Sequence, residues 1–106
     1  METVTVTEAD SGRSLAVAPG TQVVLRLPEN PTTGYRWRIT AEAAPVLRPQ
    51  EDAYAPGASM PGAGGQHRWT WQAAQPGEAA LRLDYARPWE TGPAARHFAV
   101  TIRVGP

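Results

Sequence analysis

Apolar and polar residues alternate along most of this chain with a period of two, the pattern of strands that bury one face. In the stretch 22–27, for example, Val23, Leu25 and Leu27 share a face. The pattern predicts strands at residues 1–7, 13–17, 22–27, 35–40, 67–73, 80–86 and 98–104. No helical period of comparable length lies between them, so we expect an all-β protein.

Turn-forming residues separate the predicted strands at intervals of about ten residues. From Val46 the chain is expected to be irregular, because Pro49 and the Gly- and Pro-rich run 56–65 interrupt the alternation. A count of seven or eight short strands with this spacing is typical of an immunoglobulin-like antiparallel β-sandwich. With 106 residues, the chain is long enough to bury one core, and we expect a single domain over residues 1–106.

The aromatic residues divide into two groups by their place in this pattern. Those assigned to the core are Tyr35, Trp37 and Phe98, with Trp69 or Trp71. Trp89 is different, because it follows Pro88 outside any alternating strand. We therefore expect its side chain to be exposed.

The stretch Asn30-Pro31-Thr32-Thr33-Gly34-Tyr35 combines several restrictions on the backbone. Pro31 fixes its own φ and drives Asn30 into an extended conformation, and the Asn30 side chain can bond to the backbone two residues on. Gly34 can adopt a positive φ. The two threonines then present stiff, small side chains at the tip. This pattern predicts either a well-formed hairpin turn or a rigid loop that can enter a narrow cleft.

Three connections should meet at one end of the predicted sandwich. Loops that alternate along the chain of such a fold emerge at the same end. The first loop (residues 30–35), the second loop (residues 56–65) and the third loop (residues 87–93) are therefore expected to be neighbours. Together they would form a composite binding edge.

Charge and composition exclude several classes of partner. Ten basic and ten acidic residues give a formal net charge of zero, and the basic residues, all arginine, are scattered. Nucleic acids and anionic membranes attract a basic surface, so we expect neither as the partner. The chain has no cysteine, which excludes disulfides, thiolate zinc sites and a cysteine nucleophile. No basic stretch with a following apolar run precedes the first strand, so we expect the chain either to remain in the cell or to have lost an export segment.

Catalytic and metal-binding chemistry is not indicated. The serines, Ser11, Ser14 and Ser59, lie outside a Gly-X-Ser-X-Gly context, and no paired carboxylates flank a predicted cleft. His67 and His97 lack the ligand spacing of a metal site, so each is expected to be solvated or packed. We expect no catalytic residue, no metal and no cofactor.

Three motifs follow one another in the chain: Asn30-Pro31-Thr32-Thr33-Gly34-Tyr35 with Trp37, then Gly62-Ala63-Gly64-Gly65, then Arg87-Pro88-Trp89 with Gly92-Pro93. In these motifs, over residues 23–104, the chain resembles the chagasin family of protein inhibitors of papain-like cysteine proteases. The resemblance implies an immunoglobulin-like fold and a reversible, non-covalent inhibitor rather than an enzyme. Its partner would be a papain-like cysteine protease, and we expect the inhibitor to be a monomer.

The resemblance also implies a role for each loop. The first loop would enter the protease cleft and cover the catalytic cysteine and histidine with Thr32 and Thr33. The second would pair with the enzyme through its main chain, and the third would pack on the primed side through Trp89, with Arg87 contacting the enzyme or bracing the loop. The residues assigned to protease binding are Asn30, Pro31, Thr32, Thr33, Gly34, Tyr35, Gly62, Ala63, Gly64, Gly65, Arg87, Pro88 and Trp89.

Two alternatives stay open from the residues alone. Gly64 and Gly65 could form a flexible tether rather than a contact surface. An exposed tryptophan at the edge of a β-sandwich also fits a carbohydrate- or ligand-binding module, because its ring can stack on a sugar. Stoichiometric loss of papain activity would distinguish an inhibitor from such a module.

Overall fold

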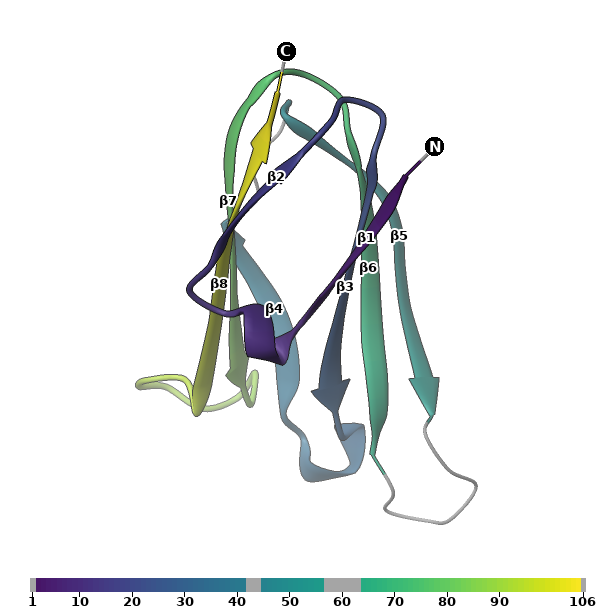
Figure 1. The fold of residues 1–106 in the computed structure, drawn as a ribbon. Coiled ribbons are helices and arrows are strands. Elements are labelled where there is room, and N and C mark those ends of the chain that lie inside the picture. The colour runs from purple at the N-terminus through teal and green to yellow at the C-terminus, as the bar shows by residue number, and fades with distance from the viewer. Residues whose placement is uncertain (1, 42–44, 57–63, 106) are drawn as a thin grey trace.

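The structure, a computed structural model, describes residues 2–41, 45–56 and 64–105. Within these residues, eight strands form two sheets that face each other (Figure 1). The strands are β1 (Thr3–Thr7), β2 (Ser14–Val17), β3 (Gln22–Glu29), β4 (Arg36–Ala41), β5 (Leu47–Pro56), β6 (Gly65–Ala73), β7 (Gly77–Ala86) and β8 (Arg96–Val104). Two short 3₁₀ turns, η1 (Glu8–Asp10) and η2 (Pro31–Thr33), connect β1 to β2 and β3 to β4.

The strand order confirms the expected all-β, immunoglobulin-like sandwich. One sheet has the order β1-β3-β6-β5 and the other β2-β8-β7-β4. The sheets are mixed rather than purely antiparallel, because β1 pairs parallel to β3 and β2 pairs parallel to β8. The turn η1 takes the chain from β1 in one sheet to β2 in the other. Both strands lie at sheet edges, and each runs parallel to the strand beside it.

The core lies between the sheets and is made by the inward residues of the alternating strands. The fully buried large side chains are Leu25, Leu27, Leu47, Trp71, Leu81, Leu83, Phe98 and Ile102. Trp37, Trp69 and Phe98 are buried, as the sequence predicts. The assignment of Tyr35 to the core is wrong, because Tyr35 precedes β4 and is only half-buried.

The region after Val46 is a strand and not the irregular segment that the prolines predict. Strand β5 runs from Leu47 to Pro56 and pairs with β6, with a break in register between Pro49 and Glu51. It lies at the edge of its sheet. An edge strand needs backbone donors on one side only, and a bulge accommodates a proline, so the prolines do not prevent the pairing.

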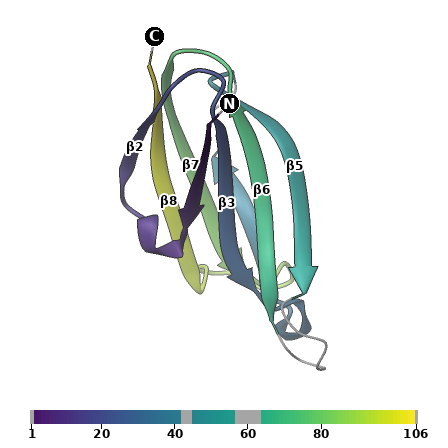
Figure 2. The same cartoon turned by 45° about the vertical axis from the view of Figure 1, so that its right-hand side comes forward.

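The ends of the strands place the loops. In Figures 1 and 2, β3, β5 and β7 end, and β4, β6 and β8 begin, at the end of the sandwich opposite to the start of β1. The first and third loops therefore leave from the same end, as the fold class predicts. Of the second loop, only Pro56, Gly64 and Gly65 are among the described residues.

Gly65 begins β6 in a position that only glycine fits. It pairs with Glu29 of β3 on one side and with Pro56 of β5 on the other. A Cβ atom on Gly65 would lie 2.2 Å from the carbonyl oxygen of Ala55, whereas one on Gly64 would lie 3.5 Å from the Cβ of Asn30. The missing side chain of Gly65 thus serves the packing of its own sheet.

We expect the substitution Gly65→Ala to lower the free energy of unfolding by about 1–3 kcal/mol, the usual cost of overpacking a fixed backbone contact. Gly64→Ala is the matched control and should change it by less than about 0.5 kcal/mol. Urea unfolding of both variants measures the difference. Equal stabilities would contradict the close approach of Gly65 to β5.

Candidate functional site

The first loop is held by hydrogen bonds within its own few residues. The Asn30 side-chain oxygen Oδ1 accepts from the Thr32 backbone N–H at 3.2 Å and from the Thr32 hydroxyl at 2.6 Å. The Thr33 hydroxyl donates to the Asn30 carbonyl oxygen at 2.7 Å. Thr33 Oγ1 also lies 3.3 Å from the Tyr35 backbone nitrogen, which donates to it. The predicted side-chain bond from Asn30 to the backbone two residues on is therefore confirmed.

Gly34 follows this turn with a φ of +84°, in the left-handed region, as the sequence predicts. The neighbouring Thr32 and Thr33 are exposed at the tip. Pro31 is the first residue of the short 3₁₀ turn η2. A loop of this kind loses little conformational freedom when a partner binds it.

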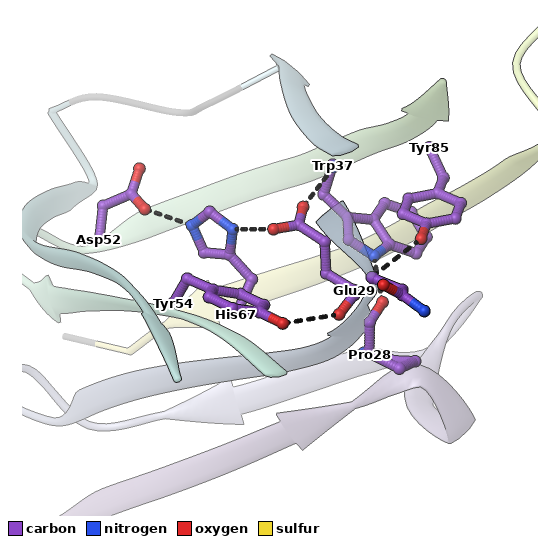
Figure 3. A network of polar contacts seen from close by, with 8 residues as sticks. Pro28, Glu29, Trp37, Asp52, Tyr54, His67 and Tyr85 are labelled. Carbon is purple, nitrogen blue, oxygen red and sulfur yellow. Dashed lines mark hydrogen bonds and ion pairs between the residues drawn. The ribbon is translucent and has the colours of Figure 1, made fainter. Parts of the chain in front are cut away.

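A buried carboxylate closes the base of the first loop (Figure 3). Glu29 is the last residue of β3, and its side chain is only 4% exposed. Glu29 Oε2 accepts a hydrogen bond from the Trp37 backbone N–H at 2.8 Å, and Glu29 Oε1 lies 3.0 Å from His67 Nδ1. The bond to Trp37 joins the two strands that flank the first loop.

Two tyrosine hydroxyls and an indole hold the same short piece of backbone (Figure 3). The Tyr54 hydroxyl donates to the Glu29 carbonyl oxygen at 3.3 Å, and the Tyr85 hydroxyl accepts from the Asn30 backbone N–H at 3.3 Å. Trp37 Nε1 donates to the Pro28 carbonyl oxygen at 2.8 Å. The position where β3 passes into the first loop is therefore fixed from both sheets.

Sequence reasoning missed Glu29 and its pairing with His67, which was expected only to be solvated or packed, although a signal for the pairing exists. Glu29 continues the inward face of β3 beyond Leu25 and Leu27, and His67 continues the inward face of β6 that carries Trp69. A carboxylate and an imidazole at inward positions both need partners. Their pairing becomes visible only with the strand order, which places β3 beside β6.

Arg87 joins the third loop to the first. Its Nε donates to the Thr33 carbonyl oxygen at 3.1 Å, and its guanidinium carbon lies 4.4 Å from the centre of the Tyr35 ring. The Tyr35 ring in turn stacks on Tyr85 with 5.4 Å between the ring centres. Arg87 also donates to Glu90 Oε1 at 3.0 Å, and this hydrogen bond raises the pKa of the guanidinium above its ordinary value. Arg87 thus braces the loops, one of the two roles that the sequence left open.

Trp89 is exposed, as its position outside any strand predicts. Its side chain is the one large apolar side chain exposed among the residues that the structure describes, at 70%. It lies in the turn that the Glu90 backbone N–H closes on the Arg87 carbonyl oxygen at 3.1 Å, with Pro88 also exposed. The edge of the indole rests on Gly34, where a Cβ atom would lie 2.3 Å from Trp89 Cη2. Trp89 is therefore presented beside the tip of the first loop.

The predicted second-loop residues are only partly placed. Gly62 and Ala63 lie outside the described residues. Gly64 is exposed and adjoins Asn30, and Gly65 is enclosed between β3 and β5. The described end of the second loop therefore lies next to the first loop, and the third loop adjoins the first loop on Gly34.

The described part of the chain contains no group of three or more His, Cys, Asp or Glu side chains arranged to hold a metal ion. His97 lies at the surface with its Nδ1 2.8 Å from Asp84 Oδ1. Within the same residues, no helix has the length and apolar character to cross a membrane.

A sandwich that displays a constrained Asn-Pro-Thr-Thr-Gly loop beside an exposed tryptophan has the form of a loop-presenting binding protein. The model of the chagasin family peptidase inhibitors, I42, matches residues 16–104 of this chain. The chain therefore belongs to the chagasin family of peptidase inhibitors, a family of inhibitors rather than enzymes.

One curated relative supports this assignment, and two solved structures share the fold. The chain is 36% identical to chagasin from Trypanosoma cruzi over 92% of its own length and 94% of that protein. The crystal structure of the cysteine protease inhibitor EhICP2 from Entamoeba histolytica superposes with a TM-score of 0.89 at 22% identity, covering 98% of this chain and 96% of that one. PbICP-C in complex with falcipain-2 superposes with a TM-score of 0.61 at 14% identity, covering 99% and 98%.

We expect Gly34→Ala to reduce stability more than Gly92→Ala does. Both glycines have a positive φ, but a Cβ on Gly92 meets no atom within 4 Å, whereas one on Gly34 meets the Trp89 ring. The strain of a positive φ costs about 1–2 kcal/mol in each case, and Gly34→Ala adds the displacement of Trp89.

A double-mutant comparison isolates that added cost. In a Trp89→Ala background, urea unfolding should give similar losses for Gly34→Ala and Gly92→Ala. A difference that persists without the indole would show that contact with Trp89 is not the cause of the larger loss at Gly34.

Proposed function

We propose that this protein inhibits papain-like cysteine proteases reversibly, by placing its three loops in the active-site cleft. One observation carries the proposal: the first and third loops form a single braced unit that presents two threonines beside an exposed tryptophan. Arg87 bonds to Thr33, and Trp89 rests on Gly34. Membership in the chagasin family and the naming of relatives as cysteine protease inhibitors support the same function.

The chemistry of the unit fits occlusion of a narrow cleft. Thr32 and Thr33 are exposed at the tip and would cover the catalytic cysteine and histidine of the protease. Their loop is already held by internal hydrogen bonds, so binding would cost little ordering entropy. The falcipain-2 complex of PbICP-C, a structural neighbour, supports a protease as the partner of this fold.

Trp89 would provide the apolar contact on the primed side of the cleft. A large, mostly exposed indole on a braced turn is typical of a residue that contributes strongly to a protein interface. Arg87 has its guanidinium engaged by Thr33, Glu90 and Tyr35, so it would act mainly by holding Trp89 in place. Gly64, beside Asn30, would lie at the edge of the contact, and Gly62 and Ala63 remain assigned from the family resemblance.

The protein should titrate papain activity stoichiometrically and leave serine proteases and metalloproteases active. Trp89→Ala should weaken inhibition by about 1–4 kcal/mol, the range for a residue at the centre of an interface. Because Trp89 is 70% exposed, the melting temperature of the variant should stay close to that of the wild type. Inhibition constants and calorimetric melting curves measure the two effects.

The same assay separates the proposal from a sugar-binding module. Binding to glycans without any effect on papain-like enzymes at micromolar inhibitor would refute inhibition. A large drop in melting temperature for Trp89→Ala would instead show that the indole stabilises the fold.

Inhibition should be non-covalent, because the chain has no cysteine for a mixed disulfide and its first loop is a tight turn. A substrate lies extended across a protease with its scissile carbonyl aligned for attack, and a turn does not offer that alignment. The inhibitor should therefore bind a protease whose catalytic cysteine is replaced by alanine. Mass spectrometry after prolonged mixing with active enzyme should find it intact, and a covalent adduct or cleavage within residues 30–35 would overturn this mechanism.

A further inference from the structure

Two carboxylates flank one imidazole at the end of the sheet that carries the first loop (Figure 3). His67 lies on the inner strand β6, with Glu29 on β3 to one side and Asp52 on β5 to the other. His67 Nδ1 contacts Glu29 Oε1 at 3.0 Å, and His67 Nε2 contacts Asp52 Oδ1. The imidazole ring is stacked flat on Trp69, with 4.0 Å between ring centres and 4° between the planes.

The number of protons on His67 decides whether both of its contacts can be hydrogen bonds. An ionised carboxylate only accepts hydrogen bonds, and a neutral imidazole has only one N–H to donate. When both carboxylates are ionised, both contacts of His67 can be hydrogen bonds only if the ring is a doubly protonated imidazolium. The complete network therefore holds one proton more than the network with a neutral ring.

Loss of that proton affects the two contacts unequally. The Asp52 side chain is 66% exposed and can turn to water, whereas the Glu29 side chain is 4% exposed and cannot. A neutral His67 would therefore keep a single N–H directed at Glu29 and release Asp52. The buried carboxylate would then lose the nearby positive charge that compensates its burial.

The buried carboxylate is what connects His67 to the first loop. Glu29 directly precedes Asn30 in the chain, and its second oxygen holds the Trp37 backbone N–H at 2.8 Å. A change in the charge partner of Glu29 therefore acts on the two strand ends from which the first loop leaves.

We propose that Glu29, His67 and Asp52 are positioning residues for the first loop, and that protonated His67 holds the loop in its inhibitory geometry more firmly than neutral His67. This rests on the proposed function. The effect requires the doubly protonated ring, so inhibition is stronger at acidic than at alkaline pH.

The charged groups described near His67 belong either to this network or to a separate ion pair. Among the described residues, the ring contacts Glu29 on β3 and Asp52 on β5, and Tyr54 of β5 is the register partner of His67. Arg68 projects from the opposite face of β6 and pairs with Glu51 of β5 at 2.6 Å. The pair of Arg68 and Glu51 links the same two strands without touching the network.

The first test compares inhibition by the wild type and by His67→Asn at several pH values. An asparagine amide can donate to Glu29 from near the position of Nδ1 but does not titrate. We expect His67→Asn to inhibit papain about tenfold less strongly than the wild type at about pH 5.5, and about equally at about pH 8. Taking the ratio at each pH cancels the titration of the protease itself.

Matched controls come from the chain. His97→Asn removes the other histidine, and Glu51→Gln breaks the exposed pair between β5 and β6. Neither should change the pH dependence of the ratio. A ratio for His67→Asn that is constant with pH, or one that changes equally for His97→Asn, would overturn the proposal.

The second test needs no protease. In the labelled protein, the amide signals of Thr32, Thr33 and Gly34 should shift with pH at the same midpoint as the His67 ring nitrogens. They should not shift in this way in His67→Asn. If the amide signals of the first loop do not shift together with the His67 ring signals, the positioning role is overturned, even if the wild type inhibits.

Asp52→Asn keeps the proposal testable if His67→Asn does not fold, because Asp52 is exposed. It should reduce the amplitude of the pH-dependent shifts in the first loop, and an unchanged amplitude would count against the network. Failure of the wild type to inhibit any papain-like protease would refute the proposed function, while the amide shifts still decide whether His67 positions the loop.

Discussion

Burial of the Glu29 carboxylate is the constraint on which the loop-bearing end of this protein depends. A buried charge costs several kcal/mol unless hydrogen bonds and an opposite charge compensate it. The compensation comes from the Trp37 backbone on one sheet and from His67 on the other. The strands β3, β4 and β6 must therefore meet in one arrangement for the carboxylate to be satisfied. This requirement fixes the two strand ends that carry the first loop, which a purely apolar contact would fix less specifically.

The third loop uses the geometry that this base provides. Tyr85 reaches the Asn30 backbone with its hydroxyl and supports the Tyr35 ring with its face. The Arg87 guanidinium lies over Tyr35 and bonds to the Thr33 carbonyl oxygen. The first and third loops are thus a single unit before any partner binds, so the ordering cost of binding is met largely during folding.

The sequence predicts more of the fold than of the site. Period-two alternation identifies the inner strands, because their inward residues are apolar, and a turn signal predicts the positive φ of Gly34. It fails for β5, because an edge strand tolerates Pro49 and needs no apolar alternation. The alternation also does not predict the pairing of Glu29 with His67, because it does not show which strands are neighbours. The exposure of Trp89 is predicted correctly, but its contact with Gly34 depends on tertiary structure.

The site separates residues that hold the loops from residues that are free to contact a partner. Glu29, Gly34 and Arg87 make their contacts inside the molecule, so we expect substitutions there to alter the shape of the binding edge. Thr32 and Trp89 are exposed, so much of their surface contributes little to the stability of the fold. Surface substitutions of such residues usually change stability little, whereas truncation of a central interface residue can cost much of the affinity. Preference for one protease over another can therefore change at the exposed positions while the frame beneath them stays intact.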